Sequence, residues 1–231
     1  MRAGILQPGY LPWLGFFEQI YKSDVFVIYD NVQYDKQGWR NRNRIKTPEG
    51  AQWLTIPVRT GGKGGILIKN VEIDNQSSWQ KKHLQALRTY YSRAPFFKHY
   101  FPGIECILSK KWRFLIDVDM ECIHFFLARL GLKKKIVYSS SLSVASSDAT
   151  ERIISVCKHL GARMFYQGAA GKDYLQEEKF AENGIGIEYQ EYVCKPYPQL
   201  YGDFMEKLSI VDLLFNAGDR SLEYITQEKI F

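Results

Sequence analysis

The apolar positions along this chain follow the pattern of strands in some stretches and the spacing of helices in others. This alternation predicts a mixed α/β fold. An apolar stretch over residues 3–8 and a β-branched and aromatic stretch over residues 25–30 are typical of buried strands. Between them, residues 15–24 carry apolar side chains near helical spacing. A strand, turn, helix and strand within about 30 residues form a βαβ unit, so we expect these two strands to be parallel.

The middle of the chain changes pattern. Residues 52–58 read as a strand, and residues 66–74 alternate as an antiparallel strand would. Helical segments follow over approximately residues 76–133. This order predicts a short antiparallel hairpin and a helical insert.

A second α/β half follows the insert. Residues 146–162 are predicted to form a helix, with Asp148 or Ser147 as its N-cap. Strands are expected over residues 163–168 and 185–192. We therefore expect a single α/β domain over the whole chain, with a mostly parallel, open, Rossmann-like sheet.

Composition narrows the functional classes only slightly. The 231 residues are 45% hydrophobic and 24% charged, which is typical of a globular protein without membrane insertion. A net charge of +6 favours acidic partners such as nucleotide phosphates, an acidic carrier protein or RNA, although scattered solvated lysines would give the same total. The four cysteines are far apart and show no metal-ligand spacing, so we expect no metal site and a cytoplasmic location.

The segment over residues 7–15, "QPGYLPWLG", is the first candidate for ligand contact. It follows the first predicted strand and precedes a helix, whose free N–H groups suit a phosphate or carboxylate. The same segment also suits a simple turn with Trp13 packed in the core. The candidate side chains are Gln7, Tyr10 and Trp13.

A second candidate is the polar stretch over residues 32–65. Arginines and asparagines alternate in it: Arg40, Asn41, Arg42, Asn43 and Arg44. On a strand the three arginines would share one face and the two asparagines the other. Because guanidinium groups bind phosphate and carboxylate in bidentate fashion, this stretch reads as a binding loop, with a solvated hairpin as the alternative.

Two further features could carry chemistry. Trp79, His83 and Leu87 share one helical face, so His83 is expected to point inward, where it could serve as a base or as a satisfied core histidine. After the strand over residues 163–168, a turn containing Gly168 and Gly171 precedes Lys172. Such a turn can wrap phosphates through its N–H groups, or merely connect a strand to a helix.

Taken in order, several blocks resemble the WbqC-like protein family. They are "QPGYLPWLGFFEQIYKSDVFVIYDNVQY", "NRNRIKTPEGAQWLTIPV", "WQKKHLQAL" with "TYYSRAPFF", "TERI" with "LGARMFYQGAAGKDYL", and "YPQLYGDFMEKLSIVDLLFNAG". Together they span nearly the whole chain. One departure is Gln167 before Gly168, where the family commonly has a serine, so a role for a hydroxyl group at that position does not carry over.

The resemblance implies an N-acyltransferase of bacterial surface-polysaccharide biosynthesis, such as that of O-antigen or lipopolysaccharide. It would transfer an aminoacyl group, for example glycine, to a nucleotide-linked amino sugar. Such a reaction needs a neutral amine, and our candidate bases are His83 and Asp30. The expected binding residues are Gln7, Tyr10, Trp13, Gln33, Asn41, Arg42, Asn43, Arg44, Gly168, Gly171, Lys172 and Tyr174.

The donor under this hypothesis is an acyl thioester on an acidic acyl-carrier protein or an aminoacyl ester on tRNA, with no resident cofactor. Two alternatives stay open. One is an ATP-dependent amide ligase of nucleotidylyltransferase-like fold, although Tyr10 and Trp13 stand where the paired histidines of such enzymes are expected. The other is a non-catalytic module that binds nucleotide-sugars or RNA. Convergence of Asp30, His83 and Arg42 in one cleft would favour an enzyme.

Overall fold

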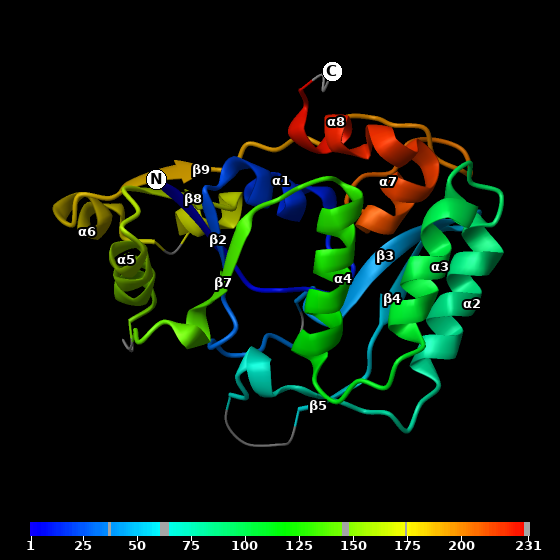
Figure 1. The fold of residues 1–231 in the computed structure, drawn as a ribbon, viewed down its shortest axis with the longest axis horizontal. Helices are drawn as coiled ribbons and strands as arrows, with labels where there is room; N and C mark the ends of the chain where they lie inside the picture. The colour runs from blue at the N-terminus through cyan, green and yellow to red at the C-terminus, as the bar shows by residue number, and fades with distance from the viewer. Residues whose placement is uncertain (37, 61–64, 145–147, 174, 229–231) are drawn as a thin grey trace. The chain divides into compact units, whose positions relative to one another are not determined.

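The structure is a computed structural model that describes residues 1–36, 38–60, 65–144, 148–173 and 175–228 (Figure 1). The chain folds into two compact units. Unit 1 comprises residues 1–7, 16–31 and 133–193, and unit 2 comprises residues 8–15, 32–132 and 194–231. Nearly all of the expected helical insert belongs to unit 2, whereas the grouping of the whole chain into one domain stays a prediction.

Unit 1 is built on a five-stranded sheet in which every pairing is parallel. In spatial order its strands are β7 (Lys135–Tyr138), β2 (Val25–Ile28), β1 (Arg2–Leu6), β8 (Met164–Gln167) and β9 (Gly186–Tyr189). Numbered along the chain within this sheet, the order reads 3-2-1-4-5, which is the order of doubly wound nucleotide-binding folds. The predicted Rossmann-like sheet is confirmed, and its order reverses between β1 and β8.

The two faces of this sheet carry different helices. Ala3 and Ile5 of β1, Val25 and Val27 of β2, and Phe165 of β8 pack into an apolar core with α5 (Ala149–Leu160) and α6 (Glu177–Glu182). The opposite face is covered by α1 (Leu14–Lys22). Gly4 of β1 permits the close approach on that side, since a Cβ atom there would lie 2.3 Å from the Ser23 hydroxyl oxygen.

Short helical turns follow two of the strands. They are η2 (Ser139–Ser141) after β7 and η3 (Ala169–Asp173) after β8. Helix α5 has the predicted cap, because the Asp148 carboxylate accepts a hydrogen bond of 2.8 Å from the Glu151 backbone N–H. Gly161 ends the helix in the left-handed region, with φ of 69°. The alternative cap, Ser147, lies outside the described residues.

Unit 2 contains two antiparallel strand pairs. The longer one is the hairpin of β3 (Arg42–Thr47) and β4 (Gly50–Thr55), so a short antiparallel hairpin is present as predicted, but most of the strand expected over residues 52–58 pairs with residues 42–47 instead of residues 66–74. The shorter pairs β5 (Val58–Arg59) with β6 (Glu72–Ile73). The predicted strand over residues 66–74 is wrong in its first part, where η1 (Ile68–Asn70) forms instead. The buried side chains Ile68, Val71 and Ile73 are spaced by three and then two residues, so a turn is needed to bury all of them.

Helices complete unit 2 (Figure 1). They are α2 (Trp79–Tyr91), α3 (Phe97–Leu108), α4 (Leu115–Arg129), α7 (Ile210–Ala217), η4 (Gly218–Arg220) and α8 (Ser221–Thr226). Asp212 of α7 is buried and accepts hydrogen bonds from the hydroxyl groups of Tyr91 and Tyr197, so it is a structural polar group. Within the described part of the chain, no helix is both long enough and apolar enough to cross a membrane.

Replacing Asp148 with alanine removes the acceptor for the Glu151 N–H at the start of α5. We expect the variant to lose about 1 kcal/mol of unfolding free energy, measured by urea denaturation. Asp148→Asn keeps a capping oxygen and should lose much less. Equal losses in the two variants would contradict a capping role.

Candidate functional site

The carboxyl edge of the parallel sheet is the candidate site in unit 1. Open α/β sheets bind ligands outside the carboxyl ends of their strands, at the point where the strand order reverses. Here that point lies between β1 and β8. Gln7 follows β1, and Gly168 follows β8. The structure therefore places these two predicted residues at the start of the two loops that flank the switch point.

The turn after β8 is tightly packed. Gly168 faces Gln19 of α1, since a Cβ atom at Gly168 would lie 3.1 Å from the Gln19 amide nitrogen. Gly171 leaves no room for a side chain, because its Cβ atom would lie 2.3 Å from Cγ of Gln167. The Gly171 N–H donates to the Gly168 carbonyl at 2.9 Å. Lys172 is exposed, and its ammonium lies 5.2 Å from the centroid of the Tyr189 ring.

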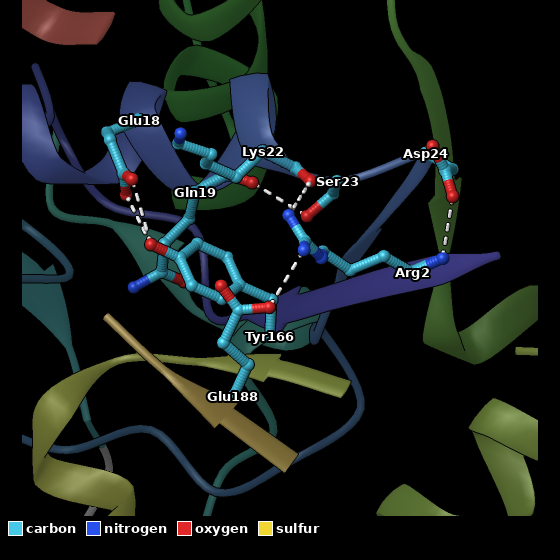
Figure 2. Close-up of polar contacts among 8 residues, drawn as sticks. All are labelled: Arg2, Glu18, Gln19, Lys22, Ser23, Asp24, Tyr166 and Glu188. Carbon is cyan, nitrogen blue, oxygen red and sulfur yellow. Dashed lines mark hydrogen bonds and ion pairs between the residues drawn. The ribbon is translucent and has the colours of Figure 1, made fainter. Parts of the chain in front are cut away.

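A buried polar network lies beside this turn, between α1 and the ends of β8 and β9. The Tyr166 hydroxyl donates to both carboxylate oxygens of Glu18, at 2.8 and 3.1 Å (Figure 2). The Gln190 amide donates to Glu18 Oε2 at 2.6 Å, and the Gln19 amide donates to Gln190 Oε1 at 2.9 Å. Because Gln190 directly follows β9 and its N–H bonds the Gln167 carbonyl, the network lies at the carboxyl edge.

Burial changes the chemistry of the Glu18 carboxyl. Loss of solvation raises the pKa of Glu18 above its ordinary value, and the hydrogen bonds from Tyr166 and Gln190 oppose that rise. Burial also raises the pKa of the Tyr166 phenol, which keeps its proton and remains a donor. Glu18 is therefore a carboxyl group whose proton affinity is moved toward neutral pH at the edge where ligands bind in such sheets.

The Tyr166 ring is held by an ion pair on the same sheet face. The Arg2 guanidinium lies 5.7 Å from the centroid of that ring and 2.8 Å from the Glu188 carboxylate (Figure 2). Arg2 also donates to the Lys22 carbonyl at the end of α1, at 3.2 Å. These contacts fix the orientation of the phenol that binds Glu18.

Asp30 lies two residues beyond β2, as expected, and it is buried. Its Oδ1 accepts from the Ser139 hydroxyl at 2.9 Å and from the Ser140 N–H at 2.8 Å, while its Oδ2 accepts from the Ser140 hydroxyl at 2.6 Å. These bonds use both carboxylate oxygens to order the turn after β7. The role of Asp30 as a base stays a prediction.

In unit 2, the segment after β1 is held by its own buried groups. Tyr10 is fully buried, and its hydroxyl lies 3.0 Å from Nδ1 of His83. The Tyr10 N–H donates to the Arg40 carbonyl, and the Arg40 guanidinium donates to the Pro8 carbonyl at 3.2 Å. Tyr10 therefore holds this segment in place from inside unit 2. Trp13 is half-buried and forms a bridge with Ser209.

His83 is buried as predicted. It packs between Tyr10 and Trp79 and also hydrogen-bonds to the backbone of Thr55. Burial lowers the pKa of His83 to about 4, so the imidazole is neutral at pH 7. The contacts with the Tyr10 hydroxyl and the Thr55 backbone suit a structural histidine; its role as a base stays a prediction.

The alternating stretch divides between the two sides of the hairpin. The Asn41 amide donates to the Ile56 carbonyl and the Asn43 amide to the Leu11 carbonyl, each at 2.7 Å, so both asparagines are buried anchors. Arg42 and Arg44 share the opposite face. The expectation of three arginines on one face is wrong for Arg40, because β3 begins only at Arg42.

The predicted site residues divide between the two units. Gln7, Asp30, Gly168, Gly171 and Lys172 belong to unit 1, and Tyr10, Trp13, Gln33, Asn41, Arg42, Asn43, Arg44 and His83 belong to unit 2. Tyr174 lies outside the described residues. Gln33 is exposed and forms a bridge with Leu67. The expected convergence of Asp30, His83 and Arg42 therefore stays a prediction.

Sequence reasoning missed the Glu18 network. The one available signal was the Glu18–Gln19 pair within an otherwise apolar part of α1. A second missed group is Asp119 of α4, which is fully buried, and for whose carboxylate oxygens no hydrogen-bond partner is found among the described residues. Burial raises the pKa of Asp119, and the charge of Arg40 partly opposes that rise.

The neutral state of His83 predicts a specific loss of stability in acid. The unfolded chain takes up a proton near pH 6.5, but the folded protein resists it down to a pKa of about 4. Stability is therefore complete above pH 6.5 and falls as the pH drops toward 4, by about 2 kcal/mol at pH 5. Urea denaturation at about pH 7 and about pH 5 should show this loss in the parent. The variant His99→Gln, which changes an exposed histidine, should show the same loss. If His83→Gln lost as much stability between these pH values as the parent, groups other than His83 would be responsible for the loss.

Comparisons with known proteins agree with the resemblance seen in the sequence. The chain is 34% identical over 226 residues to the uncharacterized protein Rv1507c of Mycobacterium tuberculosis, which covers 97% of each chain. No solved structure matches. The model of the WbqC-like protein family matches residues 7–224. This chain belongs to the WbqC-like protein family.

Proposed function

We propose that this protein is an N-acyltransferase that transfers an aminoacyl group to a nucleotide-linked amino sugar. The observation that carries the proposal is the 3-2-1-4-5 order of the parallel sheet, with a glycine turn and a buried carboxyl at its switch point. Sheets of this order bind nucleotides at that place. Family membership is consistent with a role in surface-polysaccharide biosynthesis, in the cytoplasm.

In this proposal the nucleotide lies against Gln7, at the end of β1, and the turn after β8, both in unit 1. The backbone N–H groups of the turn after β8, other than that of Gly171, which donates to the Gly168 carbonyl, would bind phosphate oxygens, because glycines let the backbone approach an anion closely. The exposed ammonium of Lys172 would add positive charge. The amide side chains of Gln7 and Gln19 would bind the sugar or the acyl oxygen.

The reaction needs an acceptor for one proton. The sugar amine attacks the acyl carbon, a C–N bond forms, and the bond from that carbon to the oxygen or sulfur of the donor breaks. We assign proton acceptance to Glu18, because its buried carboxyl combines a raised pKa with a place at the carboxyl edge. The proton then passes to the departing oxygen or sulfur. His83 is a weaker candidate, because burial lowers its pKa to about 4.

The direct test incubates purified protein with nucleotide-linked amino sugars and either a glycyl thioester or a glycyl-tRNA. We expect a mass increase equal to one glycyl residue, without any need for ATP. A product that forms only with ATP and free amino acid, with release of AMP or ADP, would instead support an amide ligase. Tight nucleotide-sugar binding with no product from any donor would support a binding module.

Replacing Glu18 with glutamine should remove the base and keep the shape of the network. We expect kcat to fall roughly 100- to 10,000-fold with little change in the affinity for the nucleotide-sugar. The matched control is Glu178→Gln, which changes an exposed carboxylate of α6 in the same unit and should retain most activity. In the parent, kcat should decrease as the pH falls through the raised pKa of Glu18. A Glu18→Gln variant with parental kcat would remove Glu18 from the mechanism.

A further inference from the structure

The outer face of the β3–β4 hairpin carries two indoles interleaved with two guanidinium groups. We call the surface formed by Trp39, Arg42, Arg44 and Trp53 the indole–guanidinium face. Arg44 and Trp53 are direct cross-strand partners. The ring centroids of Trp39 and Trp53 lie 4.9 Å apart, with their planes inclined by 57°. These four side chains form one continuous surface.

Each guanidinium lies over an indole. The Arg42 guanidinium carbon lies 4.7 Å from the centroid of Trp53, and that of Arg44 lies 5.2 Å from Trp39 and 5.7 Å from Trp53. Backbone carbonyls hold both groups, since Arg42 Nε donates to Gly38 at 3.2 Å and an Arg44 amino group donates to Lys207 at 3.1 Å. The planar groups are therefore ordered before any ligand arrives.

The two indoles are exposed, and they do not contribute to the buried side of the hairpin. Trp39 is 37% exposed and Trp53 is 41% exposed. The other side of the hairpin is filled by Asn43, Ile45 and Leu54, which are buried. Indoles gathered on an outer surface next to fixed positive charge indicate a binding surface.

We infer that the indole–guanidinium face binds the single-stranded 3′ end of an RNA. Unpaired bases stack on exposed aromatic rings, and arginines bind the phosphates between them. A duplex hides its base faces and would gain little from the indoles, while an acidic carrier protein would need the charge but not the rings. The net charge of +6 supports an anionic ligand.

This inference names the aminoacyl donor as an ester carried on RNA, and in that respect it rests on the proposed function. Binding of RNA to the face is a separate property, because it requires no turnover. An aminoacyl ester at the single-stranded end of a tRNA is chemically activated for attack by an amine. A protein that uses such a donor needs a surface that holds the unpaired nucleotides.

The test measures binding of a labelled single-stranded RNA of roughly ten nucleotides, by fluorescence anisotropy and by quenching of tryptophan emission. We expect the double variant Trp39→Ala/Trp53→Ala to bind this RNA roughly 5- to 150-fold more weakly than the parent. A blunt RNA duplex should bind more weakly than the single strand. The control is Trp112→Ala, which removes an indole beside Lys110 elsewhere in unit 2 and should bind RNA normally.

A second pair of variants keeps both indoles. Arg42→Gln and Arg44→Gln should each reduce the salt dependence of RNA binding, by roughly 0.7 in the slope of log affinity against log salt. Parental RNA affinity in the double tryptophan variant, equal affinity for duplex and single strand, or binding of an acidic carrier protein in place of RNA would each overturn the inference. RNA binding without glycyl transfer would overturn only the proposed function, and transfer from a thioester without RNA binding would overturn only this inference.

Discussion

The parallel pairing of β1 with β8 is the constraint on which unit 1 depends. β1 lies at the centre of the sheet and pairs on one side with β2, which follows it closely, and on the other with β8, whose Phe165 is the register partner of Ala3. That pairing brings together segments separated by most of the chain. It creates the reversal of strand order, and so decides that Gln7, at the end of β1, and the glycine turn after β8 belong to the same edge of the sheet. No local feature of either loop would do this alone.

The two faces of the same sheet differ in a way that bears on function. The side covered by α5 and α6 is an ordinary apolar core, with Phe165 stacked on Phe180. The side covered by α1 carries the carboxyl of Glu18 and the phenol of Tyr166. Burying a carboxyl costs free energy that its hydrogen bonds only partly offset, whereas a well-packed apolar pair would be as stable or more stable. A buried carboxyl kept beside the turn after β8 is therefore explained better by the proposed chemistry than by stability.

Local signals made most of the fold predictable. Hydrophobic period located β1, β2, β8, β9 and α1, and the short-range rules for caps identified Asp148 and Gly161. What sequence could not provide is contact between distant segments. The partners Glu18 and Gln190 lie on segments joined only by the tertiary fold, so neither residue suggests the other when read along the chain. The prediction of a strand over residues 66–74 failed for a related reason. The alternating pattern suggested a strand, but packing against α4 favours a turn at η1.

The contrast between His83 and Glu18 shows why geometry should precede residue type in choosing a base. Histidine is the commoner catalytic base at neutral pH, yet the environment of His83 moves its pKa down to about 4 and places the Tyr10 hydroxyl 3.0 Å from its Nδ1. Desolvation acts on Glu18 in the opposite sense, raising its pKa toward the range where a base works at neutral pH. A carboxylate also has more acceptor positions than the two donors, the Tyr166 hydroxyl and the Gln190 amide, use in their three contacts with it, so a proton can be accepted without breaking the network. Burial thus makes His83 a neutral hydrogen-bond partner that supports Tyr10, and it makes Glu18 a candidate for proton transfer.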